Sequence, residues 1–266
     1  MEASLQMECR VIAVTNQKGG VGKTTTAVNL SASLAVAEAR VLLIDFDPQG
    51  NSSSGLGISE ESVGHDIYDV LVNDVPAGEA LHHTEIDGLD IIPARIELSA
   101  AEVELIQEIS RETKLKRSIA SLKESYDYIF IDCPPSLGLL TVNALTAADT
   151  VLIPMQCEYY AMEGLKQLLG TINLIKESLN PELALEGILL TMYDARNNLA
   201  KEVVAQVKAH FPDNTFNTIV PRAVALSEAP SYGKPIILYQ AKSKGSECYI
   251  ELAKEMLEKT RNQAQG

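Results

Sequence analysis

The chain has 266 residues, of which 46% are hydrophobic and 22% are charged, and this composition excludes a disordered or low-complexity chain. Its 36 acidic and 22 basic side chains give a formal net charge of −14, which disfavours a protein coated in positive charge to hold nucleic acid. The charge is uneven: nine basic and seven acidic side chains leave residues 200–266 at +2, against −16 for residues 1–199. Such an asymmetry is a weak indication of a local anionic partner.

Apolar runs that predict buried strands alternate along the chain with amphipathic stretches that predict helices. The strands are expected at 11–15, 41–45, 89–92, 128–132, 150–153 and 187–191. The helices are expected at 24–37, 98–124 (broken), 139–147, 163–179, 199–210 and 246–260. Several strands are continuous apolar runs, so helices should cover both faces of the sheet. The order predicts an α/β fold with a mostly parallel twisted sheet, as a single domain over 1–266 with a short N-terminal extension at 1–9.

The first predicted strand is followed by a glycine-rich turn, Asn-Gln-Lys-Gly-Gly-Val-Gly-Lys-Thr-Thr-Thr at residues 16–26, which opens a helix. Glycines let successive backbone N–H groups close around phosphate oxygens, and the helix N-terminus adds partial positive charge. Lys23 is placed to reach the β- and γ-phosphates, and the Thr24 hydroxyl to ligate Mg²⁺. The P-loop pattern G-x-x-x-x-G-K-[ST] is broken at one position, because Gln17 stands where its first glycine belongs. The turn therefore predicts a phosphate site.

Carboxylates stand at the ends of two further predicted strands. Asp45 and Asp47 end the strand at 41–45, and Asp132 ends the strand at 128–132. Parallel strands bring their carboxyl ends to one edge, so these groups should converge with the phosphate turn. Asp132 is placed to hold a metal ion or its water shell, with capping of the next helix as the alternative.

Five blocks together resemble the ParA/MinD family of deviant Walker A ATPases, and are closest to the chromosomal ParA (Soj) type. They are Lys-Gly-Gly-Val-Gly-Lys-Thr-Thr at 18–25, Asp-Phe-Asp-Pro-Gln-Gly-Asn at 45–51, Asp-Cys-Pro-Pro at 132–135, Pro-x-Gln-x-Glu-x-x-Ala-x-x-Gly at 154–164 and Leu-Ser-Glu-Ala-Pro-Ser-x-Gly-Lys-Pro at 226–235. The resemblance spans about residues 10–259. It implies a P-loop fold, a Mg-ATP-dependent sandwich homodimer that binds DNA non-specifically, and a ParB-type partner that stimulates hydrolysis and release.

The resemblance also assigns roles to residues. Lys18 would reach across the dimer to the other subunit's phosphates, and Lys23 would act within its own subunit. Asp47 would orient the attacking water, and intrinsic ATP hydrolysis should be slow because this stretch shows no arginine finger. Magnesium would be held by Thr24 and, through water, by Asp132, with Asp45 as a further candidate. The ATP-binding residues would be Lys18, Gly19, Gly20, Val21, Gly22, Lys23, Thr24 and Thr25 at the phosphates, and Thr191, Met192, Asp194, Pro221 and Arg222 at the adenine.

The DNA surface implied by the resemblance lies in the last third of the chain. Arg196 and Arg222 match its arginines, and Lys242 and Lys244 are further candidates, although a solvated start to the last helix also explains these lysines. Ala225 stands where the family usually has a basic residue. Each phosphate contact contributes about 0.9 to the slope of log affinity against log salt concentration. The missing basic residue should therefore weaken DNA binding and flatten its salt dependence.

Other readings are weaker. A MinD-like membrane-surface ATPase needs a C-terminal amphipathic helix with several large apolar residues, whereas residues 254–266 contain two. A redox or metal-delivery relative needs paired cysteines, and the four here contain no C-x-x-C pair. A non-catalytic reader of nucleotide state would not need Lys23, Asp47 and Asp132 together. A site-specific repressor would carry an N-terminal helix-turn-helix, and about nine residues precede the first predicted strand.

The expected location is the cytoplasm of a bacterium, in association with the nucleoid. The widely spaced cysteines fit a reduced compartment better than a disulfide framework. No export signal opens the chain, and no apolar run approaches the ~20 residues that cross a bilayer, so no membrane partner is expected.

Overall fold

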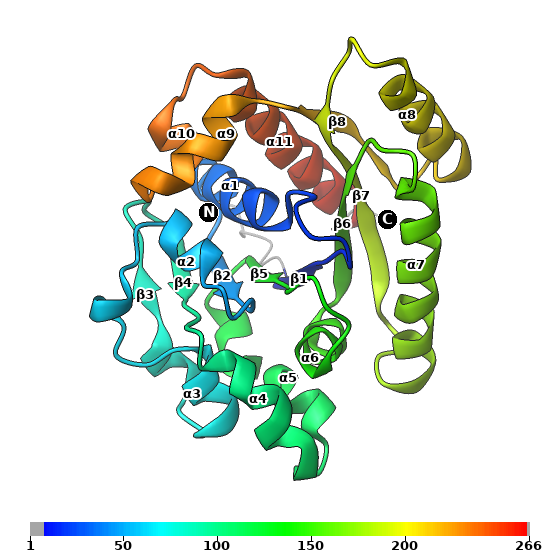
Figure 1. The fold of residues 1–266 in the computed structure, drawn as a ribbon. Helices are drawn as coiled ribbons and strands as arrows, with labels where there is room; N and C mark the ends of the chain where they lie inside the picture. The colour runs from blue at the N-terminus through cyan, green and yellow to red at the C-terminus, as the bar shows by residue number, and fades with distance from the viewer. Residues whose placement is uncertain (1–7, 265–266) are drawn as a thin grey trace.

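A computed structural model describes residues 8–264, and the strands in this range form one eight-stranded sheet (Figure 1). The strand order is β3-β4-β2-β5-β1-β6-β7-β8, and all neighbours pair in parallel except β3 and β4. The strands are β1 (Arg10–Val14), β2 (Val41–Asp45), β3 (His82–His83), β4 (Leu89–Ile92), β5 (Tyr128–Asp132), β6 (Thr150–Gln156), β7 (Ala184–Tyr193) and β8 (Thr215–Pro221). The predicted fold class is confirmed. The predicted extension at 1–9 lies outside the described residues as far as residue 7.

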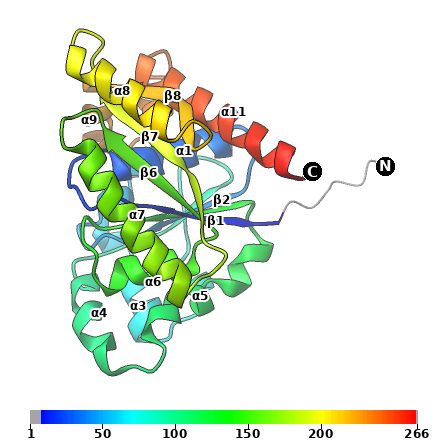
Figure 2. The same ribbon diagram turned by 90° about the vertical axis from the view of Figure 1, so that its right-hand side faces the viewer.

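Helices cover both faces of the sheet, as Figure 2 shows from the side. One face packs against α3 (Ile67–Val72), α4 (Leu98–Glu104), α5 (Lys114–Ser118), α6 (Leu139–Ala147), α7 (Ala161–Ser178) and α8 (Asn198–His210). The other packs against α1 (Lys23–Val36), α9 (Val224–Glu228), α10 (Ile236–Tyr239) and α11 (Lys244–Ala264). The short α2 (Asn51–Gly55) lies beside α1.

The strand sequences explain this layering, because neighbouring side chains point to opposite faces. In β1, Val11 and Ala13 enter the core under α6, whereas Ile12 and Val14 enter the core under α1. All four are fully buried, so the strand reads as one apolar run rather than as alternation. Within residues 8–264, no helix combines the length and the hydropathy needed to cross a membrane.

The predicted helix at 98–124 is broken, as expected. The structure has α4 and α5 there, with short 3₁₀ turns at Leu105–Gln107, Arg111–Thr113 and Ala120–Glu124. Further 3₁₀ turns are Glu60–Ser62, Ala77–Ala80 and Ala229–Tyr232, the last of which is labelled η6 here.

Sequence patterns did not predict the edge strand β8. Thr215 and Phe216 are buried, but Asn217 is exposed and Thr218 half-buried, so the segment contains no apolar run. Its outer edge is bound by α11, because the Glu255 carboxylate accepts hydrogen bonds from the N–H groups of Asn217 at 2.7 Å and Thr218 at 3.1 Å. Elements that also went unpredicted are β3, α2, α3, α9 and α10.

The carboxyl ends of β1, β2 and β5 meet at one edge of the sheet. Asp132 at the end of β5 lies in register with Val14 of β1 on one side and with Asp45 of β2 on the other. The loop that follows β1 and the carboxylates of β2 and β5 are therefore brought together by strand pairing alone.

Candidate functional site

The loop between β1 and α1 presents an uncovered stretch of backbone. Gly20 and Gly22 have φ angles of 72° and 90°, in the left-handed region that favours glycine. A β-carbon at Gly19 or Gly20 would meet no atom of the described residues within 4 Å, so this backbone is open on that side. Because α1 begins at Lys23, the N–H groups of its first turn and its positive dipole end face the same space. The loop therefore has the conformation and the access that an anion needs.

Hydrogen bonds from the neighbouring strands hold this loop in place. Asn16 donates from Nδ2 to the Pro154 carbonyl at 2.8 Å, and its Oδ1 accepts from the Lys18 N–H at 3.0 Å. Farther along, the Thr191 hydroxyl donates to the Val21 carbonyl at 2.8 Å. The loop is thus fixed by β6 and β7, so little ordering remains when a ligand arrives.

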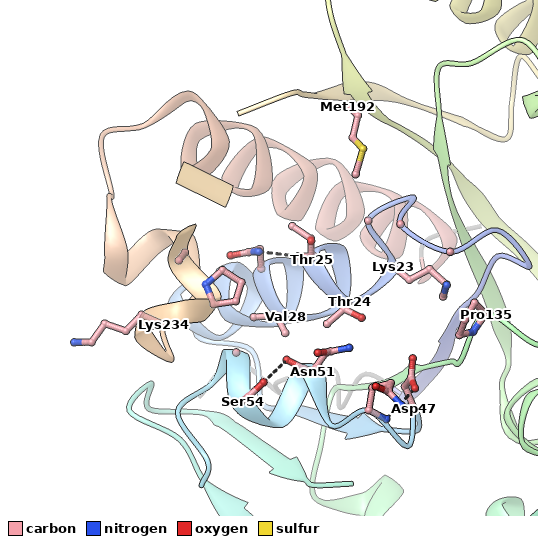
Figure 3. Close-up of a pocket in the computed structure, with 18 residues that line it drawn as sticks. Lys23, Thr24, Thr25, Val28, Asp47, Asn51, Ser54, Pro135, Met192 and Lys234 are labelled. Carbon is pink, nitrogen blue, oxygen red and sulfur yellow. Dashed lines mark hydrogen bonds between the residues drawn. The ribbon is translucent and has the colours of Figure 1, made fainter. Parts of the chain in front are cut away.

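Two adjoining cavities open in front of the loop and α1. The first, of about 460 Å³, is lined by the loop, the first turns of α1, Asp47, α2 and the segment that carries Pro230 (Figure 3). The second, of about 330 Å³, shares Gly22, Thr25, Met192 and Pro230 with the first and also includes Thr191, Pro221 and Arg222. The residues predicted to bind phosphates and those predicted to bind adenine are therefore largely divided between neighbouring cavities. Asp194 lines neither of the two, and Lys18 and Val21 face a separate small cavity beside β6.

Lys23 is the cation of the first cavity. Its residue is only 6% exposed, and its Nζ donates to the Lys18 carbonyl at 3.4 Å. Burial lowers the pKa of Lys23, while the carboxylates of Asp132 and Asp47 act in the opposite direction. A partly desolvated ammonium group with one long hydrogen bond is well prepared to bind an anion.

Two fully buried carboxylates lie behind the cavity. The Ser52 hydroxyl donates to Asp132 Oδ2 at 2.8 Å, and the Ser53 hydroxyl and N–H both donate to Asp45 Oδ2 at 2.8 Å. Burial raises the pKa of both carboxyls, and the charge of Asp132 raises that of Asp45 further. The hydroxyls of Thr24 and Ser52 lower the pKa of Asp132 in part.

The donor set fits a magnesium ion bound together with phosphates. Asp132 Oδ1 is buried and has no hydrogen-bond donor among the described residues. Such an oxygen is costly unless a cation or a bound water satisfies it. Thr24 lines the cavity and lies close enough to Asp132 to affect its pKa. Within residues 8–264, no group of three or more His, Cys, Asp or Glu could hold a metal, but Mg²⁺ needs only one or two protein ligands beside substrate phosphates.

Asp47 faces the cavity from the other side. Its residue is 8% exposed, and its Oδ1 accepts from the Gln49 N–H at 3.0 Å, which orients the carboxylate. Asp47 and Lys23 therefore line the same cavity (Figure 3). This arrangement can orient a nucleophile beside a bound phosphate.

Lys18 has a partner of its own. Its ammonium group forms an ion pair with Glu158, and the two side chains are 54% and 45% exposed. Glu158 belongs to the Pro-x-Gln-x-Glu block, but the sequence did not indicate that it pairs with Lys18. The loop thus contains one buried lysine that lines the first cavity and one exposed lysine that does not.

The residues predicted to bind DNA are exposed. Arg196 donates to Asp194 from Nη2 at 2.8 Å and from Nε at 3.0 Å, and its side chain is 91% exposed. These bonds, the Arg196 N–H and the Arg222 charge lower the pKa of Asp194 to about 2. Arg222 thus lies near this pair, and Asp194, predicted to contact adenine, is instead engaged by Arg196.

The predicted lysines lie at the start of α11. Lys242 and Lys244 are exposed, and the next residue, Gly245, leaves no room for a β-carbon against Leu226 of α9. Lys244 is therefore held beside the helix that carries Ala225. The structure brings Arg196 and Arg222 close to one another, and places Lys244 next to α9.

The functional residues that sequence reasoning missed are small or polar. Ser52 and Ser53 bind the two buried carboxylates, and Glu158 binds Lys18. Serines after an Asp-Pro-Gln-Gly-Asn run carry no sequence signal of their own. Only the return of α2 towards the ends of β2 and β5 reveals them.

Comparison with known proteins agrees with this geometry. Residues 9–185 match a family described as AAA domain. The chain is 58% identical to the sporulation initiation inhibitor protein Soj of Bacillus subtilis, over 93% of this chain and 98% of Soj. It is also 58% identical to the chromosome partitioning protein ParA of Myxococcus xanthus, over 94% of this chain and 88% of that protein.

Among solved structures, the chain resembles cobyrinic acid a,c-diamide synthase from Mycobacterium smegmatis, crystallised with an ATP analogue and magnesium, with a TM-score of 0.82, 39% identity and 94% of each chain covered. It also resembles the cell division ATPase MinD of Pyrococcus furiosus, with a TM-score of 0.76, 26% identity, and 94% of this chain and 98% of that chain covered. These matches extend over nearly the whole chain. The chain belongs to the Soj/ParA family of chromosome partitioning ATPases, within the ParA/MinD group.

Proposed function

We propose that the chain is a chromosome or plasmid partitioning ATPase that binds Mg-ATP in the two adjoining cavities and hydrolyses it slowly. One observation carries the proposal: the uncovered glycine backbone, Lys23, Asp47 and the unsatisfied oxygen of Asp132 converge at one sheet edge. The Mycobacterium smegmatis relative contains an ATP analogue and magnesium in one structure, and ADP and magnesium in another, which supports the same ligands here.

The triphosphate would be held by the N–H groups of residues 19–25 and by Lys23. Thr24 would ligate magnesium directly and Asp132 through water, while Asp45, whose Oδ2 is bound twice by Ser53, would support α2 instead. The adenine would occupy the second cavity, beside Thr191, Met192, Pro221 and Arg222.

Hydrolysis would depend on positioning and charge neutralisation. Bound Mg-ATP supplies the phosphoryl group and a metal that offsets its charge. Asp47 would orient the attacking water, because an ordinary carboxylate is too weak a base to do much more. Lys23 would stabilise the charge that develops on the transferred phosphoryl group.

A homodimer would complete the site. Lys18 is exposed and bound by Glu158 within its own subunit, and it does not line the first cavity. A second subunit that faces this cavity would let Lys18 exchange Glu158 for the other subunit's phosphates. Turnover would then require assembly, which fits a slow ATPase that a ParB-type partner stimulates.

The ATP-bound dimer would bind DNA without sequence preference. Each subunit would contribute Arg196, Arg222, Lys242 and Lys244, so that a small basic face forms on an acidic body. Because Arg196 already neutralises Asp194, the affinity should be modest and reversible. We further propose that the chain acts as a single domain in the cytoplasm, in association with the nucleoid.

DNA retention with ATP, with ADP and without nucleotide, measured across a salt series, tests this function. We expect DNA to be retained with ATP but not with ADP or without nucleotide, and retention to fall steeply as the salt concentration rises. Arg196→Glu should remove most of the retention but preserve ATP binding, whereas the matched charge reversal Lys166→Glu, on the exposed face of α7, should not. Equal retention in all three nucleotide states would contradict the proposed DNA switch, and absence of phosphate release would contradict the ATPase.

A further inference from the structure

The helix α2 is bound at its start to the floor of the site. Ser52 donates to Asp132, and Ser53 donates to Asp45 through both its hydroxyl and its N–H. Both carboxylates are fully buried, so these bonds are shielded from solvent. Any change in what Asp132 binds therefore acts directly on the position of α2.

The far end of α2 meets a second segment through bare backbone. Gly57 follows α2 with a φ of 78°, and Gly233 ends η6 with a φ of 63°. A β-carbon at Gly57 would lie 3.0 Å from the Gly233 carbonyl oxygen, and one at Gly233 would lie 2.8 Å from the Gly57 Cα. Both positions therefore need glycine twice, for the left-handed backbone and for the close approach.

Gly233 lies in a segment, residues 224–236, that we call the link. The link contains α9, with Ala225, and begins two residues after Arg222. It lines the first cavity with Ala229 and Pro230. The block at 226–235, one of the five that resemble the ParA/MinD family, lies wholly within the link, although the chemistry of the site uses little of that block.

The link has a second anchor on α1. The Ile236 N–H donates to Asn29 Oδ1 at 2.6 Å, and Asn29 Nδ2 donates to the Thr25 carbonyl at 2.7 Å. Asn29 is buried, one turn beyond the phosphate-binding end of α1. The link is therefore held at one point by the helix that carries Thr24 and Thr25, and at another by the helix bound to Asp132.

We propose that the backbone contact between Gly57 and Gly233 couples the ATP site to the DNA surface, by making the link follow movements of α2. The proposal rests on the proposed function and concerns its regulation. A contact between two backbones contains no rotamer that can absorb a displacement, so a shift of α2 is passed on to the link. Gly57 and Gly233 are positioning residues, since neither contacts the ligand cavities.

Gly57→Ala tests the proposal. Couplings between sites commonly change affinity 5- to 150-fold, so we expect the ratio of DNA affinities with ATP and with ADP to fall by about tenfold or more. ATP affinity in the absence of DNA should change little. By linkage, the factor by which DNA increases the ratio of ATP affinity to ADP affinity should fall equally, a result that mere local damage would not give. Gly64→Ala is the matched control, because Gly64 is exposed and nothing lies within 4 Å of its β-carbon position.

The outcomes separate the two proposals. If the unaltered protein does not bind DNA in response to ATP, the proposed function fails. If it does, and a folded Gly57→Ala variant keeps the full ATP-to-ADP ratio, the coupling is wrong. Should the variant not fold, amide hydrogen exchange of the unaltered protein decides: protection of residues 226–236 that differs between ATP and ADP, beside an equal change in residues 51–57, supports the coupling, and unchanged protection of 226–236 overturns it.

Discussion

The phosphate site and the cationic surface around Arg196 hold their charges in opposite ways. Lys23 is 6% exposed and lies within the influence of the Asp132 and Asp47 carboxylates, and the fully buried Asp132 is bonded by Ser52 of α2. Arg196 is 91% exposed in its side chain and is bonded only two residues away, to Asp194. The first arrangement is built by the fold, whereas the second is built by one loop.

This difference sets how each region responds to its surroundings. Buried charges interact through a medium of low effective dielectric and are weakly screened by salt, so nucleotide binding should depend little on ionic strength. The exposed pair of Arg196 and Asp194 is screened and worth little, so phosphate oxygens of DNA can compete for the arginine. A strongly held nucleotide site and a weakly held cationic surface are consistent with the proposed nucleotide-controlled binding of DNA.

Lys23→Ala should have the largest effect. Removing the buried cation leaves the triphosphate without its main charge partner, so we expect ATP binding to weaken by about 100-fold or more. Titration with a fluorescent ATP analogue measures this, with Lys166→Ala as the control. Affinity within a few-fold of the unaltered protein would mean that the phosphate site lies elsewhere.

Asp47→Ala separates binding from turnover at the same site. Without the carboxylate that orients water, hydrolysis should fall by about 10²-fold or more, while ATP binding and dimer formation remain. The protein should therefore stay on DNA once ATP is bound. Phosphate release and DNA retention are measured side by side, and brisk turnover in this variant would remove Asp47 from the mechanism.

Ala225→Arg tests whether α9 belongs to the exposed surface that binds DNA. One added phosphate contact in each subunit gives two in a dimer, so the slope of log affinity against log salt should steepen by about 1.8. DNA affinity at low salt should rise by about tenfold, and ATP affinity should stay constant. A salt slope equal to that of the unaltered chain would show that α9 does not contact DNA.

Asp45→Asn should have the smallest effect, on stability rather than activity. Burial and the charge of Asp132 raise the pKa of Asp45 in the folded state, so the folded protein binds more protons than the unfolded chain. Its stability is therefore fullest below the ordinary carboxyl pKa of about 4 and declines as the pH rises towards neutrality. In denaturant unfolding, the free energy of unfolding of the variant should increase relative to that of the unaltered protein, by on the order of 1 to 3 kcal/mol between pH 4 and 7. An unchanged difference between pH 4 and 7 would contradict the raised pKa.

Most of the sheet was predictable because its strands are buried on both faces. All six predicted strands are present, as β1, β2, β4, β5, β6 and β7, because their runs are largely apolar. The edge strand β8 was not predicted, because Asn217 and its neighbours face solvent or α11 and interrupt the apolar run. The short helix α3 carried a usable signal, the Asp66–Asp69 capping box, that its six residues made easy to overlook.

The site was predictable where short-range chemistry defines it. Glycines before Lys23 and carboxylates at strand ends follow local rules, and strand pairing alone brings them together. The contacts of Ser52, Glu158 and Asn29 join positions up to 207 residues apart and depend on how short helices pack over the sheet. No local pattern contains that information.

The hydrogen bonds between Glu255 and β8 affect how the protein behaves at high concentration. An outer strand with free N–H groups is a template on which another chain can add, and repeated addition leads to aggregates. Here the carboxylate occupies the N–H groups of Asn217 and Thr218, while the opposite edge ends in a strand of only two residues. Glu255 and the shortness of β3 thus leave little strand edge on which a second chain could add, which disfavours uncontrolled aggregation when the protein is crowded.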